Sequence, residues 1–164
     1  MGNNELNMKT VLSPAFSKIW DNSLLGVMVI DRHGVIQYMN HLLIRTDDLQ
    51  DEDIIGQKMV DFYPLERDCH VSIQTLETGK PTFKKTVVYY TQKKKLVNSL
   101  CSSFPLISHG QVEGVIHFAL NLQTSQALLD QHQDKAATKV PFSPQDAYYS
   151  FDSLIGKDHR FQNR

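Results

Sequence analysis

Residues 26–40, GVMVIDRHGVIQYMN, constrain the fold of this chain more than any other stretch. Two short apolar runs, 27–30 and 35–39, flank a polar turn that ends in Gly34. β-branched residues on both sides of a tight turn with glycine predict a β-hairpin. Asn40 follows directly, in the position of a helix N-cap before another apolar stretch. The sequence therefore predicts a strand, a turn, a second strand and a capped helix.

The size, charge and cysteine content of the chain exclude several classes of protein. Its 164 residues suffice for one ordinary domain with flanking segments. A net charge of -1 gives no basic field for nucleic acid and no acidic field for a basic partner. No apolar run approaches the ~20 residues of a membrane span, and no signal peptide is visible. We therefore expect no membrane segment. Cys69 and Cys101 have neither CxxC nor zinc spacing, so we expect no metal and a reducing, cytoplasmic location.

Helical segments are predicted on both sides of the hairpin. Residues 1–12 begin with a polar run and are predicted to be disordered. Ser13 and Pro14 begin an amphipathic helix of about nine residues. This helix either packs on the sheet of its own domain or pairs with a second copy of the chain. A longer helix over 68–78 ends at Gly79.

Three further strands are predicted in the second half of the chain, over 83–91, 96–106 and 112–122. A lysine-rich turn separates the first two, and a turn with Gly110 separates the last two.

The order of these elements resembles a PAS sensory domain. The spacing from Asp31 through Gly34 to Asn40 matches the usual start of that family. A later phrase of the chain, SFPLISHGQVEGVIHFALNLQT, resembles the closing hairpin of that family. In this phrase Asn121 replaces the usual Asp. The resemblance also implies a helical turn over 51–57, DEDIIGQ, which Gly56 would end with a positive φ. The resemblance covers residues 24–124. It implies an α+β PAS fold, a five-stranded antiparallel sheet with helices on one face, plus the N-terminal amphipathic helix.

The residues after this region suggest how the chain continues. Residues 125–148 predict an exit helix and a linker. The next phrase, YSFDSLIG, resembles the Y-x-F-D-x-[IL]-[IL]-G motif that opens the AAA+ domain of sigma-54-dependent transcriptional activators. We therefore expect a disordered N-terminus over 1–12, a PAS domain with its leading helix over 13–124, and the truncated start of an AAA+ domain over 149–164.

The motifs favour sensing over catalysis. The sequence has no GxxxxGK[ST], HExxH or GxSxG motif, so no enzyme is predicted. The resemblance implies a module that binds a small metabolite and relays binding to the ATPase domain. Similarity to arginine-utilisation regulators within that class implies an arginine-pathway amino acid such as ornithine or citrulline. For the full-length protein it implies ATP binding, sigma-54 RNA polymerase and enhancer DNA as partners, and a homodimer.

The strand pattern of the PAS family predicts a pocket, because alternate residues of a strand face the same side of a sheet. Its inner face is unusually polar for a core, and buried polar groups need partners. The predicted ligand-binding residues are Tyr89, Ser99, Cys101, Ser103, His117, Asn40, Met28, Met59 and Phe62. The outer face and the leading helix are apolar. The predicted dimer contacts are Phe16, Ile19, Trp20, Ile116, Phe118 and Leu120.

Several interpretations stay open at this point. His117 is either a core histidine bonded to a serine or water, or a contact to a ligand carboxylate. The ring of Tyr89 fits core packing, and its hydroxyl fits a ligand contact. The whole module is alternatively a ligand-free dimerisation domain, or a haem-based redox or gas sensor with His70 as the candidate ligand. The sequence lacks the flavin-binding phrase of light sensors, and no cofactor is predicted.

Overall fold

The computed structural model describes residues 6–50, 52–63, 65–66 and 69–136. A five-stranded, fully antiparallel sheet with the strand order β2-β1-β5-β4-β3 forms the centre of the fold. The strands are β1 (Gly26–Asp31), β2 (Ile36–Met39), β3 (Thr82–Tyr90), β4 (Leu96–Ser108) and β5 (Gln111–Asn121). The hairpin and the three later strands are thus confirmed, and with them the predicted five-stranded sheet.

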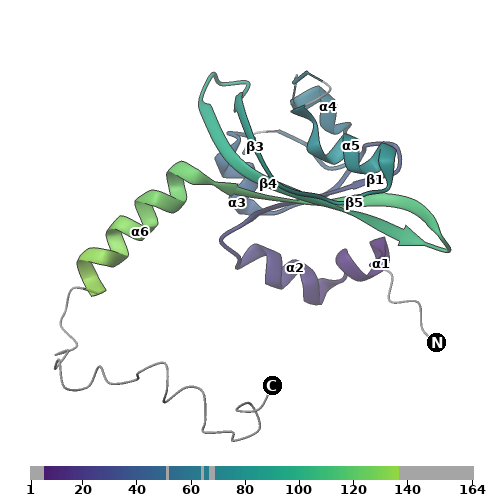
Figure 1. The fold of residues 1–164 in the computed structure, drawn as a ribbon, viewed down its shortest axis with the longest axis horizontal. Coiled ribbons are helices and arrows are strands. Elements are labelled where there is room, and N and C mark those ends of the chain that lie inside the picture. The colour runs from purple at the N-terminus through teal and green to yellow at the C-terminus, as the bar shows by residue number, and fades with distance from the viewer. Residues whose placement is uncertain (1–5, 51, 64, 67–68, 137–164) are drawn as a thin grey trace, which may run out of the picture. The chain divides into compact units, whose positions relative to one another are not determined.

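Helices cover both faces of the sheet (Figure 1). One face carries α3 (His41–Thr46), α4 (Met59–Phe62) and α5 (Val71–Thr78), which ends at Gly79 in the left-handed conformation. The opposite face carries α1 (Met8–Val11) and α2 (Pro14–Asp21). None of the described helices is both long and apolar enough to span a membrane.

The two faces of the sheet bury separate apolar clusters. The inner cluster, between the sheet and α3–α5, includes Met28, Cys101 and Val115. The outer cluster, between the sheet and α1–α2, includes Val29 and Ile116. Neighbouring residues of β5 therefore face opposite sides, as strand parity predicted. This alternation places the polar residues of the inner face opposite α3–α5.

The N-terminal residues differ from the prediction. Disorder over 1–12 is wrong for residues 6–12, which form α1 and its flanks. Val11 is 1% exposed in the outer cluster, and the backbone N–H of Ile107 donates to Leu6 O at 2.7 Å. The polar composition concealed this order because the segment is held by an apolar sheet face distant in sequence. Residues 1–5 lie outside the described part of the chain.

The segment predicted as a helical turn over 51–57 is not helical where it is described. Gly56 has the predicted positive φ, 85°. Its N–H donates to Ile36 O at 2.8 Å, and Ile36 N–H donates to Gln57 O at 2.8 Å. The segment thus forms hydrogen bonds with the backbone of the edge strand β2. Pairing these backbone groups is more favourable than a local helical turn.

The leading helix packs on the sheet of its own domain. Trp20 of α2 contacts Phe118 of β5 with ring centroids 5.4 Å apart, and Tyr38 Oη donates to Asp21 at 2.9 Å. Ile116 is 1% exposed beneath the helices, whereas Ile19 is 56% exposed. The dimer contacts therefore stay a prediction. Ile116 is inaccessible to a partner in this arrangement, and Ile19 is accessible.

The exit helix begins earlier than predicted. α6 (Leu122–Ala136) follows β5 directly. The side chain of Asn121 accepts a hydrogen bond from the Thr124 N–H at 3.0 Å, and Ser125 Oγ donates to Asn121 O at 2.7 Å. An amide at this position therefore still caps the turn that leaves the sheet. The predicted linker after residue 136 and the predicted AAA+ start over 149–164 lie outside the described residues.

Gly114→Ala is expected to destabilise the domain, because Gly114 lies where two backbones meet. A Cβ on this residue of β5 would lie 2.4 Å from Ile30 O and 2.7 Å from Cε of Met8. Overpacking of this kind costs about 2 kcal/mol. Urea unfolding measures the loss, with Gln111→Ala as the control, since Gln111 lies exposed on the same strand. If Gly114→Ala were as stable as the wild type, this result would contradict the close packing of β1 on β5.

Candidate functional site

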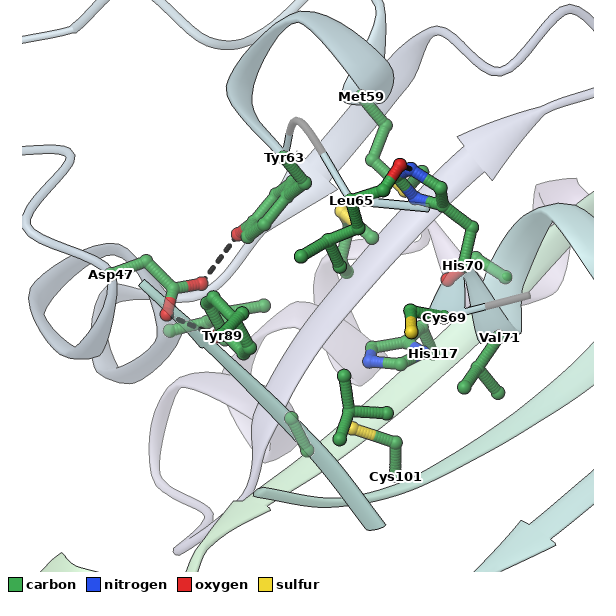
Figure 2. A pocket seen from close by; sticks show the side chains of 15 residues that line it. Asp47, Met59, Tyr63, Leu65, Cys69, His70, Val71, Tyr89, Cys101 and His117 are labelled. Carbon is green, nitrogen blue, oxygen red and sulfur yellow. Dashed lines mark hydrogen bonds between the residues drawn. The ribbon is translucent and has the colours of Figure 1, made fainter. Parts of the chain in front are cut away.

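A cavity of about 50 Å³ lies between the inner face of the sheet and the covering helices (Figure 2). At roughly 10–15 Å³ per water, this is room for about four water molecules or a small ligand group. Apolar side chains, such as Met28 and Met59, form part of its wall. The polar side chains of its lining are Asp47, Tyr63, Cys69, His70, Ser72, Tyr89, Cys101 and His117.

The C-terminal turn of α3 places Asp47 at the cavity. Asp48 has a left-handed backbone, with φ of 59°. The Leu49 N–H donates to Ile44 O at 2.9 Å, and Asp48 N–H donates to Arg45 O at 3.4 Å. This pair of bonds is the Schellman motif, with an aspartate in the position that glycine usually occupies. Because Leu49 is buried beyond this turn, the backbone that carries Asp47 is fixed from both sides.

Two tyrosine hydroxyls converge on Asp47 from separate elements (Figure 2). Tyr63, just after α4, donates to Oδ2 at 2.5 Å, and Tyr89 of β3 donates to Oδ1 at 2.5 Å. The two tyrosine rings meet edge to face, with centroids 5.9 Å apart. A carboxylate in the domain interior is thus held between two neutral donors.

Burial dominates the acid–base behaviour of this group. It raises the pKa of Asp47 from 3.8 to about 6, although both tyrosine hydrogen bonds and Lys95 act to lower it. Burial and the nearby carboxylate raise the pKa of Tyr63 and of Tyr89 well above their usual value. Both phenols therefore stay protonated and act as donors to Asp47.

His117 lies on β5 at the cavity, as its predicted site role requires. Its Nδ1 lies 2.8 Å from Ser103 Oγ, so the structure has the histidine–serine pair that one of the two interpretations predicted. Burial lowers the pKa of His117 from 6.5 to about 4, which keeps the ring neutral at pH 7. A neutral ring bonded through Nδ1 retains Nε2 for a contact inside the cavity.

Cys101 and His70, two further lining residues, interact with neighbouring groups of the protein. Burial, followed by the charge of Asp47, raises the pKa of Cys101 to about 12, so its sulfur is a neutral thiol. His70 Nε2 lies 3.0 Å from Leu65 O, which occupies the nitrogen that a haem iron would need. Among the described residues, no group of three acidic, cysteine or histidine side chains is placed to hold a metal ion.

The structure brings five of the nine predicted ligand-binding residues to the cavity. These five are Met28, Met59, Tyr89, Cys101 and His117. Ser103 lies behind His117, and Ser99 is 1% exposed without a hydrogen-bond partner for its Oγ. Phe62 packs against the inner cluster outside the lining. Parity placed the strand residues among them on the correct face but did not show which of them reach open space.

Asn40, predicted as a ligand contact, is a structural junction that lies outside the cavity lining. It caps α3 by accepting from the Leu43 N–H at 3.1 Å and also accepts from the Val27 N–H at 3.0 Å. Its Nδ2 donates to Trp20 O and Leu25 O, both at 2.8 Å. The residue therefore satisfies four backbone groups at once.

Sequence reasoning missed Asp47 and Tyr63, the partners of Tyr89. Asp47 follows a predicted helix in the phrase TDDL, and Tyr63 follows the apolar run MVDF. The available signal was the end of α3. There Asp48 stands in the position that glycine usually occupies and has a left-handed backbone. Their meeting point is not visible locally, because Asp47 and Tyr89 are 42 residues apart.

Comparison with known structures identifies the fold. The domain matches the PAS domain of a protein from Colwellia psychrerythraea with a TM-score of 0.56 and 16% identity, over 66% of this chain and 94% of that one. It also matches the E. coli DhaR(N)–DhaL complex with a TM-score of 0.54 and 16% identity, over 64% of this chain and 34% of that one. These similarities show the PAS fold.

Comparison of this sequence with those of known proteins finds similarity to a transcriptional activator. The chain is 20% identical over 153 residues to the transcriptional activator RocR of Bacillus subtilis. The match covers 93% of this chain and 32% of RocR, so the chain spans about a third of the relative's length. No family model matches the chain. The PAS fold and the match to RocR agree with the predicted resemblance: the chain has a PAS fold and is similar in sequence to part of a transcriptional activator.

Proposed function

We propose that the chain is the signal-sensing module of a transcriptional activator and binds a small polar metabolite in the cavity on the inner face of its sheet. The similarity to an activator and the PAS fold support a regulatory module that is not an enzyme. The observation that carries the proposal is the cavity itself. It gathers a buried carboxylate, two phenols and a neutral histidine around a space of about 50 Å³.

The proposed ligand is an arginine-pathway amino acid, such as arginine, ornithine or citrulline. The cavity lining combines hydrogen-bond donors and acceptors of the kind that orient small polar ligands. A ligand changes the state of a sensor only when it binds two conformations with different affinity. In this proposal α6, which leaves β5 without an intervening loop, carries that difference towards an AAA+ ATPase domain.

The proposal extends to the full-length protein through the similarity to RocR. We propose that it is cytoplasmic, forms a homodimer, and acts with sigma-54 RNA polymerase at enhancer DNA. The DhaR(N)–DhaL structure supports a protein partner as a further possibility for this fold, because there the relative is in a complex.

One specific observation favours a second candidate function, a dimerisation module without a ligand. Apolar side chains remain exposed on β3 and at the start of β4, beside the area that α1 and α2 cover. Phe83 is 63% exposed, Val88 55%, Tyr90 65% and Leu96 42%. A second copy of the chain would bury such a surface.

Thermal unfolding with a panel of amino acids and organic acids tests the sensor proposal. A ligand at a hundred times its Kd adds about 2.7 kcal/mol to the free energy of unfolding. The expected result is an increase in Tm of several degrees for one chemical group of ligands. Tyr89→Phe should reduce that increase, because the Tyr89 hydroxyl lies at the cavity.

Tyr90→Phe is the matched control, since Tyr90 is 65% exposed on the opposite face of the same strand. It should respond to ligands as the wild type does. If no compound of the panel shifts the Tm while the protein stays dimeric, the dimerisation module is the better account.

A further inference from the structure

We propose that Asp47 recognises a positively charged nitrogen of the ligand, either an ammonium or a guanidinium group. This inference rests on the proposed sensor function and names the chemical class of the ligand. Asp47 is 3% exposed and belongs to the cavity wall. None of the residues that line the cavity in the described chain is a lysine or arginine.

The hydrogen bonds of Asp47 leave room for such a group. An ionised carboxylate offers about four acceptor positions on its two oxygens. Tyr63 uses one position on Oδ2, and Tyr89 uses one on Oδ1. Among the contacts of the described residues, each oxygen therefore keeps a lone pair, and the two tyrosines fix the carboxylate plane in advance. A cationic N–H donor would complete the acceptor sites without moving either phenol.

The charges around Asp47 come from several elements, and one of them is cationic. Lys95, in the turn after β3, contacts Asp48 at 3.9 Å and donates to Thr46 O at 3.0 Å. Its side chain is 48% exposed, so this cation stands at the surface and does not line the cavity. Tyr63, Tyr89 and Cys101 face Asp47 as neutral, protonated groups, and Asp48 adds a second negative charge. Inside the cavity, Asp47 therefore has no cationic partner among the described lining residues.

This arrangement discriminates between classes of ligand. A buried carboxylate without a countercharge in its cavity is costly, and a ligand cation lowers that cost on binding. A ligand carboxylate at the same place would meet Asp47 as a like charge. His117 is neutral at pH 7 and does not repel a cation. The walls therefore favour amines and guanidines, and disfavour simple organic acids.

Two pairs of probes with nearly equal shape test this inference. n-Butylamine is compared with n-butanol, and arginine is compared with citrulline, whose neutral ureido group replaces the guanidinium. Binding to the complete chain is measured by titration calorimetry and by Tm. The variants are Asp47→Asn and, as the matched control, Asp48→Asn. Asp48 is the next residue but pairs with Lys95 and Thr91 at the surface.

The inference predicts that the cationic member of each pair binds more tightly and that Asp47→Asn weakens it by about 30-fold or more. Asp48→Asn should retain the preference. At pH 6, binding should also release protons from Asp47, and this release should be absent in Asp47→Asn. Buffers of different ionisation enthalpy measure it. This second readout detects Asp47 itself and not merely a loosened fold.

Two outcomes would overturn the inference, and they differ in what they leave standing. Equal affinity for charged and neutral probes, or unchanged binding in Asp47→Asn, removes the role of Asp47 and leaves the sensor function intact. Absence of binding for every probe, charged or neutral, removes both the inference and the proposed ligand-sensing function.

Discussion

Asn40→Ala is expected to lower the free energy of unfolding by roughly 3–5 kcal/mol, the sum of a lost helix cap and unsatisfied buried backbone groups. Asn40 is 0% exposed, and its amide bonds four backbone groups from three segments. Removal of the amide leaves the Val27 and Leu43 N–H groups without their acceptor, and frees two carbonyl oxygens. The loss is large because alanine supplies none of these bonds and the side chain of Asn40 lies in the interior.

Urea unfolding of Asn40→Ala and Asn40→Asp measures this effect. Aspartate keeps the acceptor oxygen but loses both donors, so its stability should fall between those of the wild type and Asn40→Ala. Asn22→Ala is the control, because Asn22 is exposed and its amide bonds only the Lys18 carbonyl among described partners. A change below about 1 kcal/mol in Asn40→Ala would show that these four bonds do not hold the N-terminal segment, the hairpin and α3 together.

Opposite pH dependences are expected from Asp47 and His117. The pKa of His117 falls from 6.5 to about 4 through burial. Its stabilising contribution is therefore complete above pH 6.5 and disappears as the pH falls through 4. The pKa of Asp47 rises from 3.8 to about 6, chiefly through burial. Its contribution is complete below pH 3.8 and disappears as the pH rises through 6. Each amounts to about 3 kcal/mol, since one pKa unit corresponds to 1.36 kcal/mol.

These two contributions oppose each other between pH 4 and pH 6 in the wild type, and single variants separate them. Relative to the wild type, His117→Gln should lose about 3 kcal/mol of stability as the pH rises from 4 to 7, and Asp47→Asn should gain about as much. Urea unfolding at several pH values measures both curves. His109→Gln, in the exposed turn between β4 and β5, should follow the wild-type curve. Parallel curves for all four proteins would mean that neither buried group titrates as described.

Much of the fold could be predicted because its signals are local. The hairpin follows from β-branched runs around Gly34, and the cap of α3 follows from Asn40 in front of an apolar stretch. Gly79 ends α5 with a φ of 64°, as glycine after a helix does. Strand parity then assigns Cys101 and His117 to one face, because a strand has a period of two residues.

The candidate site was only half predictable, because cavities depend on which side chains leave space unfilled. Parity could not show that Ser99 and Ser103 lie behind the lining while Cys101 and His117 reach it. It also could not show the ordered α1, which the polar composition of the first residues concealed. Both features depend on how distant segments pack and not on the pattern within one segment.

The sequence by itself determined the PAS-like order of elements, the turns at glycine and the two faces of the sheet. These follow from steric limits on the backbone and from the periodicity of side chains, which act within a few residues. Only the tertiary structure decided that Asp47, Tyr63 and Tyr89 meet, and that Asn40 is a junction outside the cavity lining. The physical reason is that hydrogen bonds between residues 16 and 42 positions apart exist only once the sheet and its covering helices exclude water.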